Sequence, residues 1–290
     1  MAVTELEDVV NQIATIWSPL FSDELRESHV LVNLIDKTHE GDFNMSNDRC
    51  RISQYNAGTG QDLIIDRVAA NDTACDFTPT AQSMSEVDLI INRRAVSSRE
   101  FCDTVALLSQ VKPESDALRQ TMAFEVGEVI NNHLYSLVSP TTTLNSTAAL
   151  DASVLTTLTK LADQAKWPMG SRYLLVDPTY QKDLLDDTTL VSADFVGDRP
   201  TVAGRIMSER FGWKIIMDNS AGLQTLGGGA GSAIAFIPEF MHWASPRSQF
   251  KVSDTHSSLK FGTVMSADTV YGAVQGISGA DKVIGVQVAA

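Results

Sequence analysis

The sequence is poor in the residues that mark disulfide-stabilised proteins and metal-binding proteins. It has three cysteines in 290 residues, and they lie far apart without any CxxC pair: Cys50, Cys75 and Cys102. This spacing is typical of thiols in a reducing compartment. The first residues, MAVTELEDVV, are acidic and lack the basic region and apolar run of a signal peptide. We therefore expect an intracellular product without a membrane anchor.

Basic residues are also scarce. The chain has 36 acidic residues against 22 Lys and Arg, which gives a net charge of −14. Residues 1–48 alone carry ten acidic side chains and two basic ones. Binding to nucleic acid by counterion release requires clustered Lys and Arg, so this composition argues against a nucleic-acid-binding protein. A solvated acidic surface that favours solubility is the simpler interpretation.

No motif indicates catalysis, a cofactor or a metal. The glycine-rich segment 226–236 lacks the lysine of a phosphate-binding loop and precedes a strand, so we interpret it as a surface loop. Asp186-Asp187 is expected to be solvated charge at the end of a helix. His133 is expected in the core or at an interface. The histidines show no metal-ligand spacing: His29, His39, His133, His242 and His256. We predict no enzyme, no catalytic, cofactor-binding or metal-binding residue, and no cofactor.

The longest periodic segment runs from residue 116 to 138. Its apolar residues recur every three or four positions and form one helical stripe: Leu118, Met122, Val126, Val129, Ile130, Leu134 and Leu137. Other residues fall off this stripe: Arg119, Glu125, Glu128 and Asn132. Ser139-Pro140 should end the helix, because a residue before proline avoids the α conformation. The charges in its first half exclude a membrane span.

The segments before this helix change from helical to extended. Two small helices, one from Thr4 and one over 22–35, are expected within the first 45 residues, with EGDFN (40–44) as a turn. Strands are then predicted for RISQY, DLIIDRV and EVDLIINRR. The last two would form the legs of a hairpin whose tip covers 69–85. Such a two-stranded ribbon cannot bury both faces by itself.

The segments after the long helix alternate between helices and strands. TTTLNST reads as a loop, and a helix over 151–166 should begin with Asp151 as its N-cap. A strand over 173–176 leads to a helix capped by Asp177, with Pro178 at its first position. Further strands are expected in FGWKIIM and AIAFIPEF. From Arg247 onward four terminal strands are predicted: QFKVS, LKFGTVM, TVYGAVQGI and KVIGVQVAA.

This order of parts resembles the tailed-phage major capsid proteins of the Hong Kong 97-type fold. Local phrases carry the resemblance: IWSPLF, EGDFN, DALRQTMAFEVGEVINNHL, SRYLLVDPTYQKDLL, GRIMSERFGWKIIMDNS and VYGAVQGI. The resemblance implies an α+β chain with an N-terminal arm at 1–48 and an extended loop at 49–98. It implies a peripheral domain at 99–140 and 245–290, with a spine helix at 116–138, and an axial domain at 141–244.

The resemblance also implies a function. The chain would self-assemble as pentamers and hexamers into an icosahedral virion shell around a double-stranded DNA genome, after assembly in the host cytoplasm. It implies a separate scaffolding protein, a portal protein at one vertex and room for a cement protein. Some relatives cross-link through a lysine of the extended loop, which has none here between His39 and Val111. An encapsulin-like nanocompartment, a cytosolic α+β enzyme and a non-viral filament or adhesin protein remain alternatives.

Overall fold

The computed structural model describes residues 30–43, 47–56, 81–102, 116–146, 149–187, 190, 202–203, 206–207, 209–226, 231–257 and 260–288. Among these residues, α4 (Asp116–Ser136) and α5 (Ala152–Gln164) are the two longer α-helices. Three shorter α-helices are α2 (Val30–Leu34), α6 (Pro178–Asp186) and α9 (Ala221–Leu226). The 3-10 helices are η1 (Thr38–Asp42), η2 (Met169–Ser171), η3 (Pro238–Phe240) and η4 (Gly279–Lys282). The described part of the predicted N-terminal arm (1–48) begins at Val30. The expected helix from Thr4 therefore lies outside the described residues.

The strands of the described residues form three sheets. A two-stranded ribbon pairs β1 (Arg49–Tyr55) with β2 (Met84–Ile90). A three-stranded sheet has the order β10 (Met241–Ser257), β11 (Lys260–Gln275), β3 (Arg93–Cys102). The third sheet has the order β4-β12-β9-β5-β8-β7-β6. Its strands are β4 (Thr142–Ser146), β12 (Val283–Val288), β9 (Ser232–Phe236), β5 (Tyr173–Val176), β8 (Lys214–Met217), β7 (Ile206–Met207) and β6 (Val202–Ala203).

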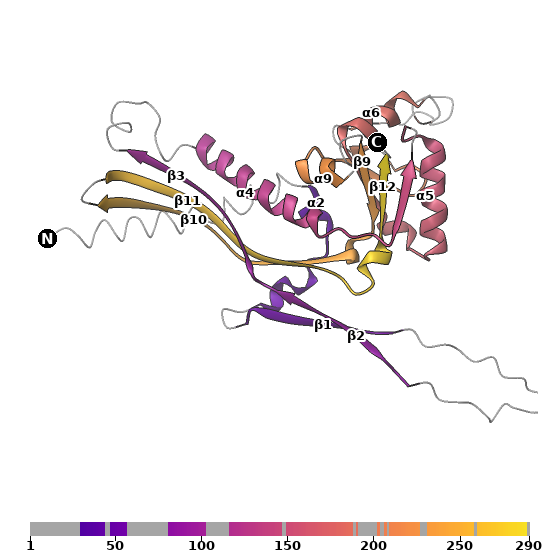
Figure 1. Cartoon of the computed structure of the whole chain (residues 1–290), viewed down its shortest axis with the longest axis horizontal. Coiled ribbons are helices and arrows are strands. Elements are labelled where there is room, and N and C mark those ends of the chain that lie inside the picture. The colour runs from indigo at the N-terminus through magenta and orange to yellow at the C-terminus, as the bar shows by residue number, and fades with distance from the viewer. Residues whose placement is uncertain are drawn as a thin grey trace, which may run out of the picture.

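The spine helix α4 lies along the three-stranded sheet, and the ribbon β1–β2 extends away from both (Figure 1). The predicted helix is confirmed over 116–136, and its last turn tightens through hydrogen bonds from Leu137 N to Leu134 O and from Val138 N to Tyr135 O. Glu125 ties the helix to β3, because it accepts a hydrogen bond of 2.6 Å from Ser97 Oγ and pairs with Arg99. Among the described residues no helix is both long and apolar enough to cross a membrane.

The predicted stripe on α4 is wrong at two positions. Val129, placed on the stripe, is 53% exposed, whereas Arg119, placed off it, is 8% exposed. The buried face is turned toward Asn131 and Tyr135, which are 0% and 1% exposed. Both side chains hydrogen-bond to Asp218, at the end of β8. An apolar pattern cannot reveal a face that is buried through polar contacts, and this explains the error.

The seven-stranded sheet separates two hydrophobic cores. Alternate residues of a strand point to opposite faces. Leu175, Ile234 and Phe236 therefore join the core beneath α4, whereas Leu174, Val176 and Ala235 join the core beneath α5 and α6. Burial on both faces explains why residues 174–176 of β5 and 233–236 of β9 are all apolar. Figure 1 shows α5 and α6 beside this sheet, at the end of the molecule opposite the far ends of β10 and β11.

Local signals predicted the two helices of this region. Asp151 Oδ1 accepts hydrogen bonds of 3.0 Å from both Ser153 N and Val154 N at the start of α5. Asp177 caps α6 through Tyr180 N at 2.8 Å, and Pro178 occupies the first turn. Both predicted N-caps are confirmed.

Strand pairing differs from the expected pairing in three places. The EVDLI segment pairs with RISQY as part of the β1–β2 ribbon. The register of this ribbon places Tyr55 opposite Met84 and Arg49 opposite Ile90. DLIIDRV and most of the expected tip lie outside the described residues. TTLNS, expected as a loop, is the edge strand β4, which pairs in parallel with β12. The last strand, β12, also pairs with β9, so it belongs to the seven-stranded sheet and not with the other terminal strands. The division into arm, extended loop, peripheral domain and axial domain remains a proposal, and β12 would belong with the axial part.

Candidate functional site

Those sequence candidates that the structure describes do not form one site. Asp186 pairs with Lys182 at 2.7 Å on the surface, whereas Asp187 accepts a hydrogen bond of 2.8 Å from Ala152 N. The two carboxylates therefore act separately, the first as solvated charge and the second at the start of α5. The glycine-rich segment is only partly described: α9 ends at Leu226 and β9 begins at Ser232. Cys50, the cysteine whose side chain is described, is a free thiol.

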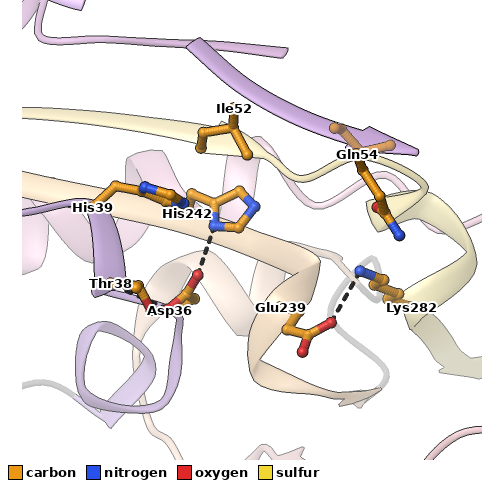
Figure 2. A pocket seen from close by; sticks show the side chains of 9 residues that line it. Asp36, Thr38, His39, Ile52, Gln54, Glu239, His242 and Lys282 are labelled. Carbon is orange, nitrogen blue, oxygen red and sulfur yellow. Dashed lines mark hydrogen bonds and ion pairs between the residues drawn. The ribbon is translucent and has the colours of Figure 1, made fainter. Parts of the chain in front are cut away.

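Two of the histidines meet at the base of the ribbon. Their rings lie edge to face, with 5.5 Å between the centroids of His39 and His242. His242 Nδ1 lies 2.8 Å from Asp36 Oδ2. Asp36 and His242 are 206 positions apart, so no spacing rule could have joined them. Figure 2 shows the three side chains pointing toward one another.

Backbone contacts fix this cluster in place. Asp36 forms an isolated parallel bridge with His242, and Trp243 N donates a hydrogen bond of 3.0 Å to Asp36 O. Thr38 donates to the second carboxylate oxygen of Asp36 through its backbone N, at 3.0 Å, and through its Oγ1. The short helix η1 thus holds Asp36 and His39 against the first residues of β10.

A cavity of about 220 Å³ opens beside the cluster. Its lining comes from four parts of the chain: Asp36, Thr38, His39, Ile52, Gln54, Glu239, His242, Ile277 and Lys282. Lys282 Nζ lies 3.2 Å from Glu239 Oε2 (Figure 2), so the cationic group in the lining has an anionic partner. Because Ile52 and Gln54 belong to β1, the cavity lies where the ribbon leaves the body of the subunit.

The surroundings of His242 and Asp36 favour a neutral imidazole beside an ionised carboxylate. Burial lowers the pKa of His242 below its ordinary value, although the hydrogen bond to Asp36 opposes this. Burial would raise the pKa of Asp36, but the hydrogen bonds from Thr38 and His242 together lower it. Near neutral pH, His242 Nδ1–H therefore donates a hydrogen bond to the Asp36 carboxylate.

A second buried polar cluster joins α4 to β8. Tyr135 Oη donates to Asp218 Oδ2 at 2.6 Å, and Asn131 Nδ2 lies 3.4 Å from the same oxygen. Burial and the Asp218 carboxylate raise the pKa of Tyr135 well above its usual value, so the phenol remains a donor. This cluster is buried between α4 and the seven-stranded sheet, and its hydrogen bonds hold the helix against the sheet.

His133 occupies the interface between α4 and β11. Tyr271 Oη lies 3.2 Å from His133 Nδ1, which agrees with the predicted core or interface position. Burial and, secondarily, Arg93 lower the pKa of His133 below its ordinary value of 6.5. The unfolded chain therefore takes up this proton at higher pH than the folded chain does.

We expect the stability of the subunit to fall as the pH drops through the ordinary histidine pKa of 6.5 toward the lowered pKa of the folded state, partly through His133. The loss begins near the unfolded pKa and ends below the lowered folded pKa. His133→Gln should show a smaller slope of melting temperature against pH than the parent chain. Thermal unfolding followed by circular dichroism at each pH provides the measurement. Equal slopes for the two proteins would show that His133 does not contribute.

Comparison with known proteins identifies both a family and a fold. A family model described as phage capsid protein matches residues 102–288. A chain in the structure of Mycobacterium phage Che8 has a TM-score of 0.69 at 20% identity, over 89% of this chain and 90% of that chain. A chain of the cyanophage Pam1 capsid asymmetric unit has a TM-score of 0.66 at 10% identity, over 87% and 88%.

The same fold occurs in a virus-like particle. A chain in the crystal structure of the particle from Pyrococcus furiosus has a TM-score of 0.55 at 9% identity, over 94% of this chain and 99% of that chain. No curated protein sequence matches the chain. At these identities the solved structures establish a shared fold, whereas the family model matches the sequence itself.

Proposed function

Because the chain belongs to the phage capsid protein family, as a major capsid protein of the virion shell, we propose that its copies assemble as pentamers and hexamers into an icosahedral shell that encloses a double-stranded DNA genome. The fold is α+β of the Hong Kong 97 type, as the resemblance predicted. The encapsulin-like alternative is not favoured, because the family match is to phage capsid proteins.

The ribbon β1–β2 is the observation that most supports assembly. The side chains of β1 are exposed or half-buried throughout, and in β2 only Leu89 is fully buried. Tyr55 and Met84, which face each other in register at the far end of the described ribbon, are 70% and 48% exposed. A two-stranded ribbon is marginal on its own. A neighbouring subunit that packs against the ribbon would bury these exposed side chains.

We further propose that the chain has other protein partners and a structural role without catalysis. A separate scaffolding protein would guide assembly in the host cytoplasm, a portal protein would replace one vertex, and a cement protein would have the outer surface available. The net charge of −14 suits a shell that does not bind the phosphates of the enclosed DNA. As a member of a structural family, the chain would perform no catalysis.

We expect the chain, expressed with its scaffolding protein, to form closed particles of uniform size. Light scattering should give a mass of many subunits, and electron microscopy should show pentamers and hexamers in a closed shell. Nuclease-protected DNA in particles from infected cells would separate a virion shell from a nanocompartment, which would hold a protein cargo. A monodisperse monomer under assembly conditions would contradict the proposal.

A further inference from the structure

The cluster at the base of the ribbon has the composition of a metal site. Asp36, His39 and His242 each place one oxygen or nitrogen atom within 4.8 Å of the others. In a tetrahedral zinc site, ligand atoms about 2.0–2.2 Å from the ion lie roughly 3.3–3.6 Å from one another. Side-chain rotations that move the ligand atoms by a few tenths of an ångström to about one ångström would bring these three atoms to that spacing.

We propose that Asp36, His39 and His242 bind one divalent transition-metal ion of the zinc class, with water from the adjoining cavity as a fourth ligand. Imidazole nitrogen and carboxylate oxygen are ligands that Zn²⁺ accepts. Neutral His242 now carries its proton on Nδ1. On metal binding this nitrogen would coordinate the ion and the proton would move to Nε2, so the neutral imidazole need not release a proton.

The surroundings of the three ligands resemble the outer shell of a metal site. Asp36 Oδ2 faces His242, while its Oδ1 is held by Thr38. His39 Nδ1 lies 3.1 Å from Asp42 Oδ2, which leaves Nε2 for the ion. A carboxylate that holds the second nitrogen of a ligating histidine fixes its ring and raises its basicity. The cationic Lys282 is paired with Glu239, which reduces its repulsion of a bound ion.

A neighbouring set shares His39 but is less suited to metal binding. It consists of His39, Asp42 and Cys50, whose ligand atoms also lie within 4.8 Å of one another. The Asp42 side chain is 60% exposed, whereas those of Asp36 and His242 are 19% and 12% exposed. The second set is also confined to η1 and β1. The first set is more enclosed and is anchored by the backbone bridge between residues 36 and 242.

A bound ion would join two distant parts of the chain at the root of the ribbon. Asp36 and His39 belong to the segment that follows α2, and His242 is the second residue of the long strand β10. A ligand that binds only the folded state stabilises it in proportion to the logarithm of its concentration. The ion would therefore strengthen the attachment of this segment, independently of whether subunits form a shell.

The test uses the soluble full-length subunit after removal of metals with a chelator. Titration with ZnCl₂ in a non-chelating buffer should give one saturable site per chain by calorimetry, and should raise the melting temperature. His242→Asn preserves a donor to Asp36 but removes the imidazole, and should weaken binding by more than about tenfold. His39→Asn should have a similar effect. It also supplies a second variant if the first fails to fold.

Two matched controls locate the site. His133→Asn removes a histidine outside the cluster and should leave zinc affinity unchanged, and Cys50→Ser should do so as well. With CoCl₂ as the probe, visible absorption typical of tetrahedral cobalt should appear without a thiolate charge-transfer band. The proposal is overturned if no saturable binding occurs, or if both cluster variants bind like the parent. Loss of binding in Cys50→Ser but not in His242→Asn would also overturn it, because the second set would then be the ligand set.

Discussion

Val126→Asp should leave the chain unfolded or insoluble. Val126 is 1% exposed and lies on α4 within the core formed with the three-stranded sheet and the seven-stranded sheet. A carboxylate placed there would be desolvated without a partner, or would have to bind a proton. The cost is on the order of 3–5 kcal/mol, a large part of the roughly 5–15 kcal/mol by which a folded domain is stable. Solubility after expression and circular dichroism of the soluble fraction are the measurements.

Val129→Asp is the matched control, because it makes the same change three residues further along the same helix. Val129 is 53% exposed, so its carboxylate would remain in water. We expect a change in the free energy of unfolding of less than about 0.5 kcal/mol. Equal damage from the two variants would show that the buried face of α4 includes Val129, as the apolar pattern alone had suggested.

Short-range signals predicted the helices and buried strands well. An Asp before a helical pattern, followed by Pro in one case, identifies the starts of α5 and α6, because capping depends on residues a few positions apart. The apolar runs at β5 and β9 identify strands that are buried on both faces. These features depend on local chemistry, and the structure preserves them.

Long-range pairing could not be predicted from local patterns. TTLNS has a polar sequence and becomes a strand only because β12 offers it an edge. The cluster of Asp36 and His242 depends on the path of the whole chain. In each case the partner lies in another segment.

Replacement of the exposed pair at the end of the described ribbon should prevent shell assembly without unfolding the subunit. In the double variant Tyr55→Glu, Met84→Lys, opposite charges face each other across the ribbon, and such pairs stabilise antiparallel strands by about 0.2–1 kcal/mol. The subunit should keep its circular dichroism spectrum and nearly its melting temperature. The same charges would be desolvated wherever the ribbon lies on a neighbour.

Because the contact is repeated in every copy, a small loss at one interface is multiplied over the whole shell. We expect the yield of particles in a sedimentation assay to fall at least about tenfold, whereas the control variant Tyr55→Phe, Met84→Leu, which keeps the surface apolar, should assemble like the parent. If the charged variant unfolds, the ribbon is part of the core of its own subunit. If it builds normal shells, this end of the ribbon is not buried between subunits, and the contact that supports assembly must lie elsewhere on the chain.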